Sequence, residues 1–249
     1  MKKLLLAAAV MVAAVPSLSL SASVASDNAT NAAYGDGWAT GDNGGTGFGI
    51  WTLSTAGGGN KGSYIGGTAL GATTFGIYAG NASDALSVAD RPFTSGALVG
   101  GQSFSVIVAN TSENFGEIGV QFRSGSNVRW TLKNVGKGSW KIDDGGAGGA
   151  FDISQSFVAN TALTLSFTYN GGNSYSYSFG SASGNNFLAT ADLSNLTGVR
   201  FYNRDQGASQ NFGFNNLSVV PEPSTYALLG VAALGLAAHV ARRHRRSSH

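Results

Sequence analysis

The chain has 249 residues, of which 37 are glycine, 11% are charged and 10% are aromatic. The formal net charge of +2 is set by the two ends, because the central part has nine basic residues against twelve acidic ones, or about −3, and this excludes a basic surface for nucleic acid. Cysteine is absent, which excludes disulfide bonds, a thiolate metal site and a thiol nucleophile. Glycine together with spaced aromatic residues favours short strands and tight turns over disorder, because the rings can bury apolar surface.

Residues 1–25 predict a Sec signal peptide, because a positive stretch, an apolar run and small residues at a cleavage site follow one another. The segments are Lys2 and Lys3, then Leu4–Val15, then Pro16, with Ser23 and Ala25 at the small-residue positions. This predicts cleavage by signal peptidase between Ala25 and Ser26, after passage through the Sec translocon. An uncleaved N-terminal anchor is the alternative, which the short apolar run disfavours because a bilayer needs about 20 apolar residues.

From residue 26 to residue 219, apolar side chains alternate with polar or small ones, which is the period of β-strands. The predicted strands contain, in chain order, Phe104–Val108, Ile118–Phe122, Val128–Leu132, Leu163–Tyr169, Tyr175–Phe179, Val199–Phe201 and Phe212–Val219. Asn170–Asn173 predicts a hairpin, since glycine-rich turn residues lie between two alternating runs. Without a long amphipathic helix, this pattern predicts an all-β, jelly-roll-like β-sandwich. The side chains expected in its core are Phe104, Val106, Val108, Leu163, Leu165 and Phe167.

The most glycine-rich part of the chain, residues 34–80, belongs to the same domain in our interpretation. It contains large aromatic residues at intervals, which flexible linkers lack. We therefore expect short strands and long loops here rather than a linker.

Residues 220–249 contain three parts in order: the motif Pro221-Glu222-Pro223, an apolar run predicted as a transmembrane helix at residues 226–241, and a basic end at residues 242–246. The basic residues that would stop translocation and hold this end in the cytoplasm are Arg242, Arg243, Arg245 and Arg246. Proline fixes φ and restricts the residue before it, so we expect the motif to be extended, outside the fold and accessible to a processing enzyme.

This tail resembles the PEP-CTERM sorting signal of bacteria, which is defined by a Pro-Glu-Pro motif, a transmembrane stretch and a basic end. The resemblance implies processing by an exosortase, an integral-membrane cysteine transpeptidase, in a Gram-negative-type envelope, commonly with exopolysaccharide or biofilm production. It implies an exported, inner-membrane-anchored precursor that then reaches the cell surface or extracellular matrix. A simple tail anchor is the alternative, whereas a GPI signal lacks a basic end and a Leu-Pro-x-Thr-Gly sortase motif is absent from the sequence.

Candidates for catalysis are few, because all three histidines lie in the tail. The central part has neither His nor Cys, which excludes a Ser-His-Asp triad, a Cys-His pair and His-ligated zinc there. Glu113 and Glu117 could form the carboxylate pair of a glycosidase, but their backbones would be about 13 Å apart on a regular strand, whereas retaining chemistry needs carboxyl groups about 5 Å apart. We expect polar residues near a turn and no catalytic residue.

Two further patterns have a functional and a structural interpretation. Asp143-Asp144-Gly145-Gly146 could offer oxygen ligands to calcium, although Asp-Gly-Gly is equally a plain turn, and we expect no metal and no cofactor. Trp130, Trp140, Tyr175 and Tyr177 could stack on sugar rings if they were exposed, but core packing is favoured for a sandwich of this size.

The body resembles the concanavalin/laminin-G type of jelly roll that often precedes such tails, on the cue of Leu163–Phe179 and the closing Phe212–Val219 strand. We therefore expect a signal peptide (1–25), a β-sandwich domain (26–219) and a sorting tail (220–249). The predicted function is that of an exosortase-sorted surface or matrix protein with a structural or adhesive, non-enzymatic role. The alternatives are a carbohydrate-binding module acting on exopolysaccharide and, less favoured, a glycoside hydrolase.

Overall fold

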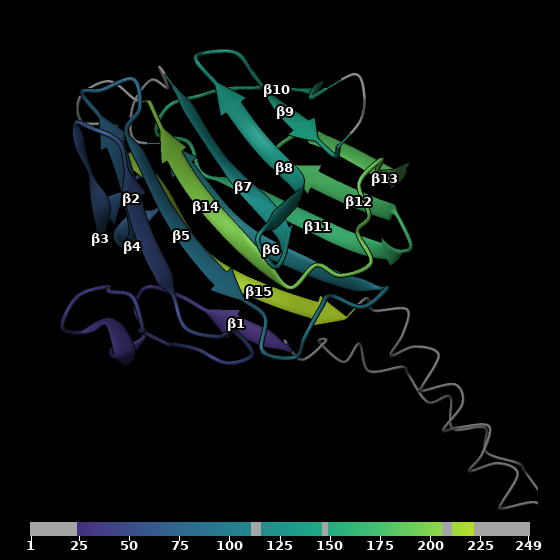
Figure 1. Cartoon of the computed structure of the whole chain (residues 1–249), viewed down its shortest axis with the longest axis horizontal. Helices are drawn as coiled ribbons and strands as arrows, with labels where there is room; N and C mark the ends of the chain where they lie inside the picture. The colour runs from purple at the N-terminus through teal and green to yellow at the C-terminus, as the bar shows by residue number, and fades with distance from the viewer. Residues whose placement is uncertain (1–23, 111–115, 146–148, 206–210, 222–249) are drawn as a thin grey trace, which may run out of the picture.

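The computed structural model describes residues 24–110, 116–145, 149–205 and 211–221. The predicted signal peptide up to residue 23, Glu113 and the tail from residue 222 onward lie outside these residues. The described part is a sandwich of two antiparallel β-sheets, which confirms the predicted fold class (Figure 1). Its one helical element is the short 3-10 turn η1 (Ala32–Tyr34).

The larger sheet has eight strands, of which seven follow the order β13-β12-β11-β6-β15-β4-β3, while β1 pairs with β15. Their bounds are β1 Ala25–Asp27, β3 Asn60–Thr68, β4 Gly71–Gly80, β6 Gln102–Asn110, β11 Leu163–Gly171, β12 Ser174–Phe179, β13 Ala182–Leu188 and β15 Asn211–Pro221. The other sheet has seven strands in the order β10-β9-β8-β7-β14-β5-β2. Their bounds are β2 Thr52–Ala56, β5 Leu86–Pro92, β7 Glu117–Ser124, β8 Asn127–Val135, β9 Ser139–Asp143, β10 Phe151–Ser156 and β14 Gly198–Arg204.

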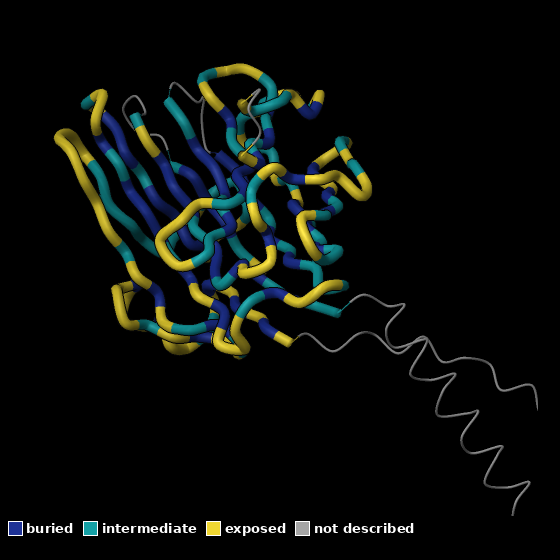
Figure 2. Tube along the Cα trace, turned by 45° about the vertical axis from the view of Figure 1, so that its right-hand side comes forward, coloured by how far each residue is buried: buried dark blue, intermediate teal, exposed yellow. Residues whose placement is uncertain are grey.

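The core lies between the two sheets, where alternate side chains of each strand meet. Figure 2 shows the buried residues of the strands in dark blue. The expected core residues Phe104, Val106, Val108, Leu165 and Phe167 are all 0% exposed, as the alternation predicts. Leu163 is only half-buried, contrary to expectation, because it is the first residue of β11 and packs at the margin of the core.

Aromatic rings join the two sheets across the core. Phe201 of β14 stacks on Phe214 of β15 with ring centroids 3.8 Å apart, and Phe104 of β6 meets Phe122 of β7 edge to face at 5.3 Å. Each such pair stabilises the fold by about 0.5–1.5 kcal/mol beyond the area that it buries. The aromatic content of the sequence therefore lies mainly inside the sandwich.

The predicted hairpin at residues 170–173 is present between β11 and β12. Gly171 and Gly172 have φ angles of 104° and 59°, a region that other residues rarely adopt. The same turn places Tyr175 and Tyr177 together on the inner face of β12, where both are buried.

Two β-bulges modify the predicted alternation. In β8 the register with β7 shifts beyond Trp130, so that Val128, which we expected on the same inner face, is 43% exposed. In β15 the register with β6 shifts at Asn216, which has a φ of 54°, and Leu217 returns to the buried face. A bulge adds one unpaired residue to one strand and thereby changes the face that the following side chains occupy.

Residues 34–80 form part of the sandwich, in line with their interpretation as strands and loops. They contribute β2, β3 and β4, and their rings pack on one another in the core. Trp51 lies with its ring centroid 5.1 Å from that of Trp38 and 5.2 Å from that of Phe75. These contacts hold the glycine-rich loops against the larger sheet.

The two ends of the described chain lie side by side. β1 pairs antiparallel with β15, with Ala25 opposite Val219, and the N–H of Val24 donates to the carbonyl of Val219 at 2.8 Å. Both ends lie at the same corner of the sandwich (Figure 1). The predicted leader and the predicted sorting tail are therefore attached to one corner of the domain.

Candidate functional site

The sorting motif begins on the larger sheet. Pro221 is the last residue of β15 and pairs with Gln102, so the first residue of the motif belongs to the fold and the strand extends two residues beyond the boundary predicted at residue 219. Proline is tolerated here because it ends the strand and continues no ladder beyond it. Glu222, Pro223, the predicted transmembrane helix and the basic end, Arg242, Arg243, Arg245 and Arg246, lie outside the described residues, and no described helix is long and apolar enough to cross a membrane.

The predicted signal-peptide cleavage site lies within β1. Ala25 is 2% exposed and pairs with Val219, while the backbone of Ser26 exchanges two hydrogen bonds with that of Thr46, at 2.9 and 2.8 Å. The bond between Ala25 and Ser26 is thus covered once β1 has paired. Cleavage at this bond stays a prediction, and it would have to precede the folding of this strand.

The candidate glutamate pair is represented in the described chain by Glu117 of β7. Its carboxylate accepts hydrogen bonds from the Tyr202 hydroxyl at 2.5 Å and from the Arg204 guanidinium at 2.6 Å. Burial raises the pKa of Tyr202, and the neighbouring Glu117 carboxylate adds to that shift. Glu117 therefore forms part of a polar cluster on the outer face of the smaller sheet, and Glu113 lies outside the described residues.

The candidate calcium ligands take part in protein contacts. Asp143 forms an ion pair with Lys133 at 3.1 Å and accepts a backbone hydrogen bond from Gly145. Asp144 is buried and accepts a hydrogen bond from the Tyr175 hydroxyl at 2.9 Å. Within the described ranges, no three His, Cys, Asp or Glu side chains come together as metal ligands. The turn interpretation accounts for this segment as far as Gly145.

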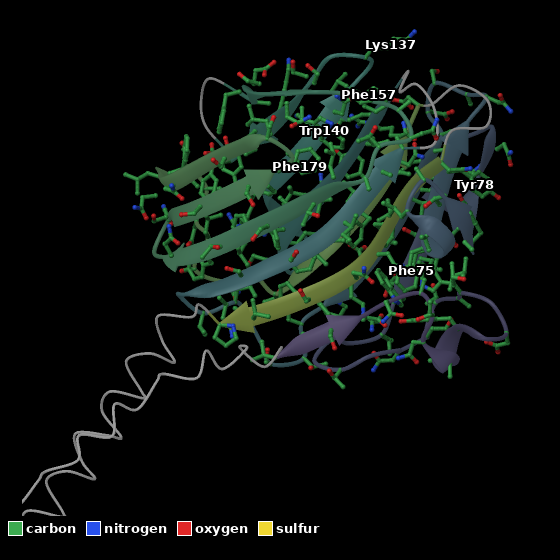
Figure 3. All side chains as sticks on the ribbon, turned by 180° about the vertical axis from the view of Figure 1, so that it is seen from behind. Phe75, Tyr78, Lys137, Trp140, Phe157 and Phe179 are labelled. Carbon is green, nitrogen blue, oxygen red and sulfur yellow. The ribbon has the colours of Figure 1, made fainter. Side chains whose placement is uncertain are left out.

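The four candidate stacking aromatics are all in the core. Trp130 and Tyr175 are 0% exposed, Trp140 is 3% exposed and Tyr177 is 7% exposed. Trp140 of β9 lies with its ring centroid 4.7 Å from that of Phe179, and both are labelled in the view from behind (Figure 3). These rings therefore stabilise the sandwich, and none of the four can stack on a sugar.

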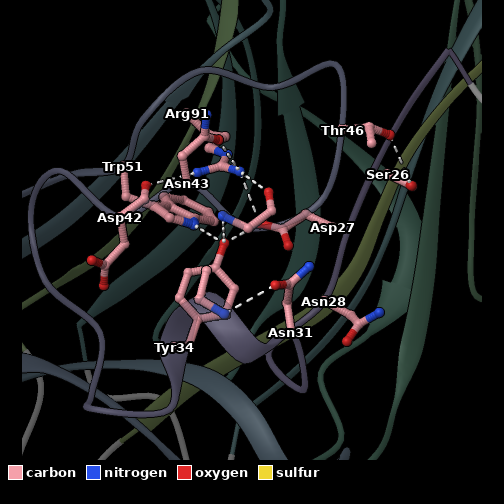
Figure 4. A network of polar contacts seen from close by, with 12 residues as sticks. Ser26, Asp27, Asn28, Asn31, Tyr34, Asp42, Asn43, Thr46, Trp51 and Arg91 are labelled. Atoms are coloured by element: carbon pink, nitrogen blue, oxygen red, sulfur yellow. Dashed lines mark hydrogen bonds and ion pairs between the residues drawn. The ribbon is translucent and has the colours of Figure 1, made fainter.

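A buried ionic cluster, which the sequence analysis missed, ties the N-terminal segment to the sandwich (Figure 4). The guanidinium of Arg91 on β5 and the carboxylate of Asp27 on β1 are both 0% exposed, with a nitrogen–oxygen distance of 3.0 Å. Arg91 also donates to the carbonyls of Asp42 and Gly44 and to the side chain of Asn43, at 3.2, 2.7 and 3.1 Å. The loop around residues 42–44 is thereby fixed onto the smaller sheet.

Tyr34 completes this cluster. Its hydroxyl donates to Asp27 and accepts hydrogen bonds from the backbone N–H of Gly44 and the indole N–H of Trp51, both at 3.0 Å. Burial, reinforced by Asp27, raises the pKa of Tyr34 to about 12. Burial also lowers the pKa of Arg91 and raises that of Asp27, so desolvation of the pair opposes their mutual attraction. Because the charged groups face one another in the interior, the cluster has a structural role.

The outer surface of the larger sheet has no charge over six neighbouring strands. The segments β13, β12, β11, β6, β15 and β4 contain no Asp, Glu, Lys, Arg or His. Their outward positions carry mainly short hydroxyl side chains, and we call the part formed by β15, β6, β11 and β12 the hydroxyl face. Its members are Ser103, Ser105, Thr164, Ser166, Thr168, Ser174, Ser176, Ser178 and Ser218.

The hydroxyl face is ordered by strand register. One row of paired residues crosses the sheet from β15 to β13, and consists of Ser218, Ser105, Ser166, Ser178 and Ser183. In the next row Ser103 pairs with Thr168, and their hydroxyl oxygens are 2.6 Å apart. The inward neighbours on these strands fill the core, so the hydroxyls point away from it. Figure 3 looks onto this side of the molecule.

Comparisons with known proteins agree with the sorting tail and with the β-sandwich body. Residues 219–246 match the PEP-CTERM protein-sorting motif, so the chain carries this signal and is an exosortase-sorted extracellular protein. No curated protein matches the sequence significantly.

Among solved structures, a sialidase aligns with a TM-score of 0.53 and 8% identity over 69% of this chain, which is only 17% of the sialidase chain. Cellulose induced protein, Cip1, aligns with a TM-score of 0.52 and 10% identity over 68% of this chain and 90% of its own length. At such identities the likeness is one of fold, and it confirms a jelly-roll type of β-sandwich body.

Proposed function

We propose that the protein is displayed at the cell surface or in the extracellular matrix, where its sandwich has a structural or adhesive, non-enzymatic role. The hydroxyl face carries this proposal. It is broad and neutral, and its strands contain no carboxylate or imidazole that could activate a nucleophile or hold a metal. Each serine or threonine hydroxyl both donates and accepts hydrogen bonds, which suits contact with another hydroxyl-bearing polymer.

Its tail supports the same proposal. A sorting signal that begins at the end of β15 would leave the domain outside the cell, held at one corner until the tail is removed. The hydroxyl face extends over strands whose far ends lie away from that corner (Figure 1). The predicted partner is neutral polysaccharide of the extracellular matrix, and a role in biofilm follows from such a contact.

The second candidate function is a carbohydrate-binding module that acts on exopolysaccharide, and the same neutral face favours it. The two candidate functions predict different affinities and stoichiometries of polysaccharide binding. A binding module would hold a defined oligosaccharide with saturable affinity, whereas an adhesive surface would bind only long polymer through many weak contacts.

To test the hydroxyl face, Ser166→Lys/Ser178→Lys is compared with Val135→Lys in the mature protein. Val135 is an exposed residue of β8 on the other sheet, so its replacement adds charge away from the hydroxyl face. We expect the double variant to lose most of its retention on a neutral exopolysaccharide, because two lysines must then be desolvated at the contact. We expect the control to be retained like the parent, with all proteins equally stable. Equal retention of all three proteins would refute the role of this face.

The non-enzymatic part of the proposal has its own test. Release of reducing ends from the same polysaccharide is measured for the parent and for Glu117→Gln. We expect none from either protein. Hydrolysis by the parent that disappears in the variant would show instead that the polar cluster around Glu117 is catalytic.

A further inference from the structure

A second feature lies on the opposite side of the molecule, on the outer face of the smaller sheet. A pocket of about 300 Å³ opens where β5 ends and β14 begins. Its walls include Thr52, Asp90, Pro92, Arg123 and Thr197, and backbone at Gly198 contributes to its lining. This volume lies at the lower end of the range for small-molecule sites, so the pocket can take about one sugar ring.

One carboxylate in this region faces two guanidinium groups. Asp90 accepts a hydrogen bond from Arg123 at 2.8 Å and two from Arg200, both at 2.8 Å. The three side chains are largely covered, with exposed fractions of 21% for Asp90, 14% for Arg123 and 26% for Arg200. The group therefore has one positive charge in excess in a place where water screens it only in part.

Several N–H donors of these two guanidinium groups have no acceptor among the described residues. Besides its bond to Asp90, Arg123 donates to the carbonyl of Ser126 at 2.7 Å, and its buried Nε–H has no partner. Arg200 donates only to Asp90 among the described residues. Each guanidinium offers five N–H donors, so acceptors for several remain to be supplied. Other acidic groups on this face are already paired, Asp143 with Lys133 and Glu117 with Arg204.

We propose that this pocket binds a carboxylate-bearing sugar unit of an extracellular polysaccharide. Arg123 lines the pocket, and Arg200 adjoins it through the shared partner Asp90. The sugar's carboxylate would accept hydrogen bonds from the free donors of Arg123 and would neutralise the excess charge of the two guanidinium groups. The hydroxyl of Thr52, on the exposed rim, would contact the ring hydroxyls. A sugar acid is the fitting class because it combines one anionic group with neutral hydroxyls on a ring of this size, and because the protein is sorted to the outside of the cell.

The pocket is separate from the hydroxyl face, so the proposal for the pocket and the proposal for the hydroxyl face can be refuted independently. Binding of the mature protein to a uronate oligosaccharide is measured by isothermal titration calorimetry at low salt. We expect Arg123→Gln and Arg200→Gln each to weaken binding about tenfold, since the first removes a charged donor from the pocket and the second removes the excess positive charge beside it. Arg204→Gln is the matched control, because Arg204 lies on the same face of β14 but pairs with Glu117 away from the pocket.

Asp90→Asn provides a test that a merely structural role would not pass. It removes the internal carboxylate that competes for both guanidinium groups, so we expect uronate binding to tighten while thermal stability stays equal or falls. Polyglutamate and dextran serve as further probes, one with carboxylates but no sugar and the other with sugar but no carboxylate. We expect neither to compete well. Unchanged uronate affinity in both Arg123→Gln and Arg200→Gln, or weaker binding by Asp90→Asn, would overturn the proposal. Equal competition by polyglutamate would overturn the assignment to a sugar.

Discussion

Arg91 is a fully buried cation whose partners come from separate parts of the N-terminal segment. Asp27 supplies the counter-charge, and further acceptors are the backbone carbonyls of Asp42 and Gly44 and the side chain of Asn43. Taking two charges out of water is costly, so such a pair adds little net stability, but removal of one partner leaves the other charge buried without compensation. The arrangement at Arg91 therefore determines where the N-terminal segment can pack.

We expect Asp27→Asn to lower the free energy of unfolding by about 3–5 kcal/mol, because Arg91 then keeps its charge in the interior without a counter-ion. Urea denaturation followed by tryptophan fluorescence measures this, with Trp51 next to the cluster as a reporter. The control is Asp143→Asn, which breaks the partly exposed pair with Lys133 and should change stability by less than about 1 kcal/mol. Similar small losses for the two variants would contradict a structural role of the buried pair.

Tyr34 makes the stability of the fold depend on pH in the alkaline range. Its pKa is about 12 in the fold against 10.0 when unperturbed, so its contribution to stability is complete below pH 10 and is lost as the pH rises toward 12. Burial also raises the pKa of Tyr175 and Tyr202, which act in the same direction. We expect the thermal midpoint to fall steadily between pH 10 and pH 12 while absorbance at the tyrosinate band lags behind that of the unfolded chain. Titration of all tyrosines near pH 10 in the folded protein would contradict this.

At this scale the sequence predicted the burial of aromatic residues well, since alternation with polar neighbours locates an inner face. The buried ion pair was missed because its members are far apart in the sequence. A local signal did exist: Arg91 stands two residues from Ala89 and Phe93, so strand alternation puts it on the inner face. An inward arginine requires a buried acceptor, although alternation cannot say which.

The strands show where a local sequence pattern no longer predicts the structure. The hairpin at residues 170–173 was predictable because its glycines have a local reason, the positive φ of the turn. The bulge at Asn216 was visible only as two residues between Phe214 and Leu217 instead of the one that regular alternation gives. The exposure of Val128 had no local signal at all, because it follows from the register between β7 and β8.

Gly119 on β7 illustrates a close approach between strands. A methyl group there would lie 2.5 Å from the carbonyl oxygen of Leu132 and 2.8 Å from the ring of Tyr202. We therefore expect Gly119→Ala to destabilise the protein by about 1–3 kcal/mol, since backbone must move to make room. The measurement is again urea denaturation.

The matched control is Gly67→Ala on β3. The nearest atom to its added methyl group is a carbonyl oxygen at 3.9 Å, so no contact opposes it. Because alanine restricts the unfolded chain more than glycine does, this variant should be unchanged or about 0.4–1 kcal/mol more stable. Equal effects at both positions would mean that loss of glycine itself, and not the contact with Leu132, decides stability.

For the molecule as a whole, the class of fold and the sorting tail could be read from sequence, but the arrangement of the sheets could not. Pairing such as β1 with β15 joins residues almost two hundred positions apart, and no local pattern encodes it. The hydroxyl face could be predicted from the sequence only in part. Alternate serines and threonines are visible in the run from Leu163 to Phe179, yet their alignment into rows depends on register across several strands.

We expect the mature surface protein to lack residues 242–249, because an exosortase would remove the tail after the motif has reached the membrane. Mass spectrometry of the C-terminal peptide measures this in the parent and in Glu222→Ala. Loss of the basic end in the parent, with retention in the variant, is the expected pair of results. Recovery of an intact basic end on the surface-exposed parent would show that the tail is a permanent anchor.

The central position of β15 also determines when, during synthesis of the chain, the larger sheet can form. This strand joins β6 to β4, so without it the larger sheet remains in two separate pieces. It is also the last strand of the domain to be synthesised, and its final residues are already part of the sorting signal, which spans residues 219–246. Non-local pairing of this kind is slow to form. The larger sheet can therefore close only when nearly the whole domain has been synthesised, so the body completes its fold at the same stage at which the sorting signal becomes available.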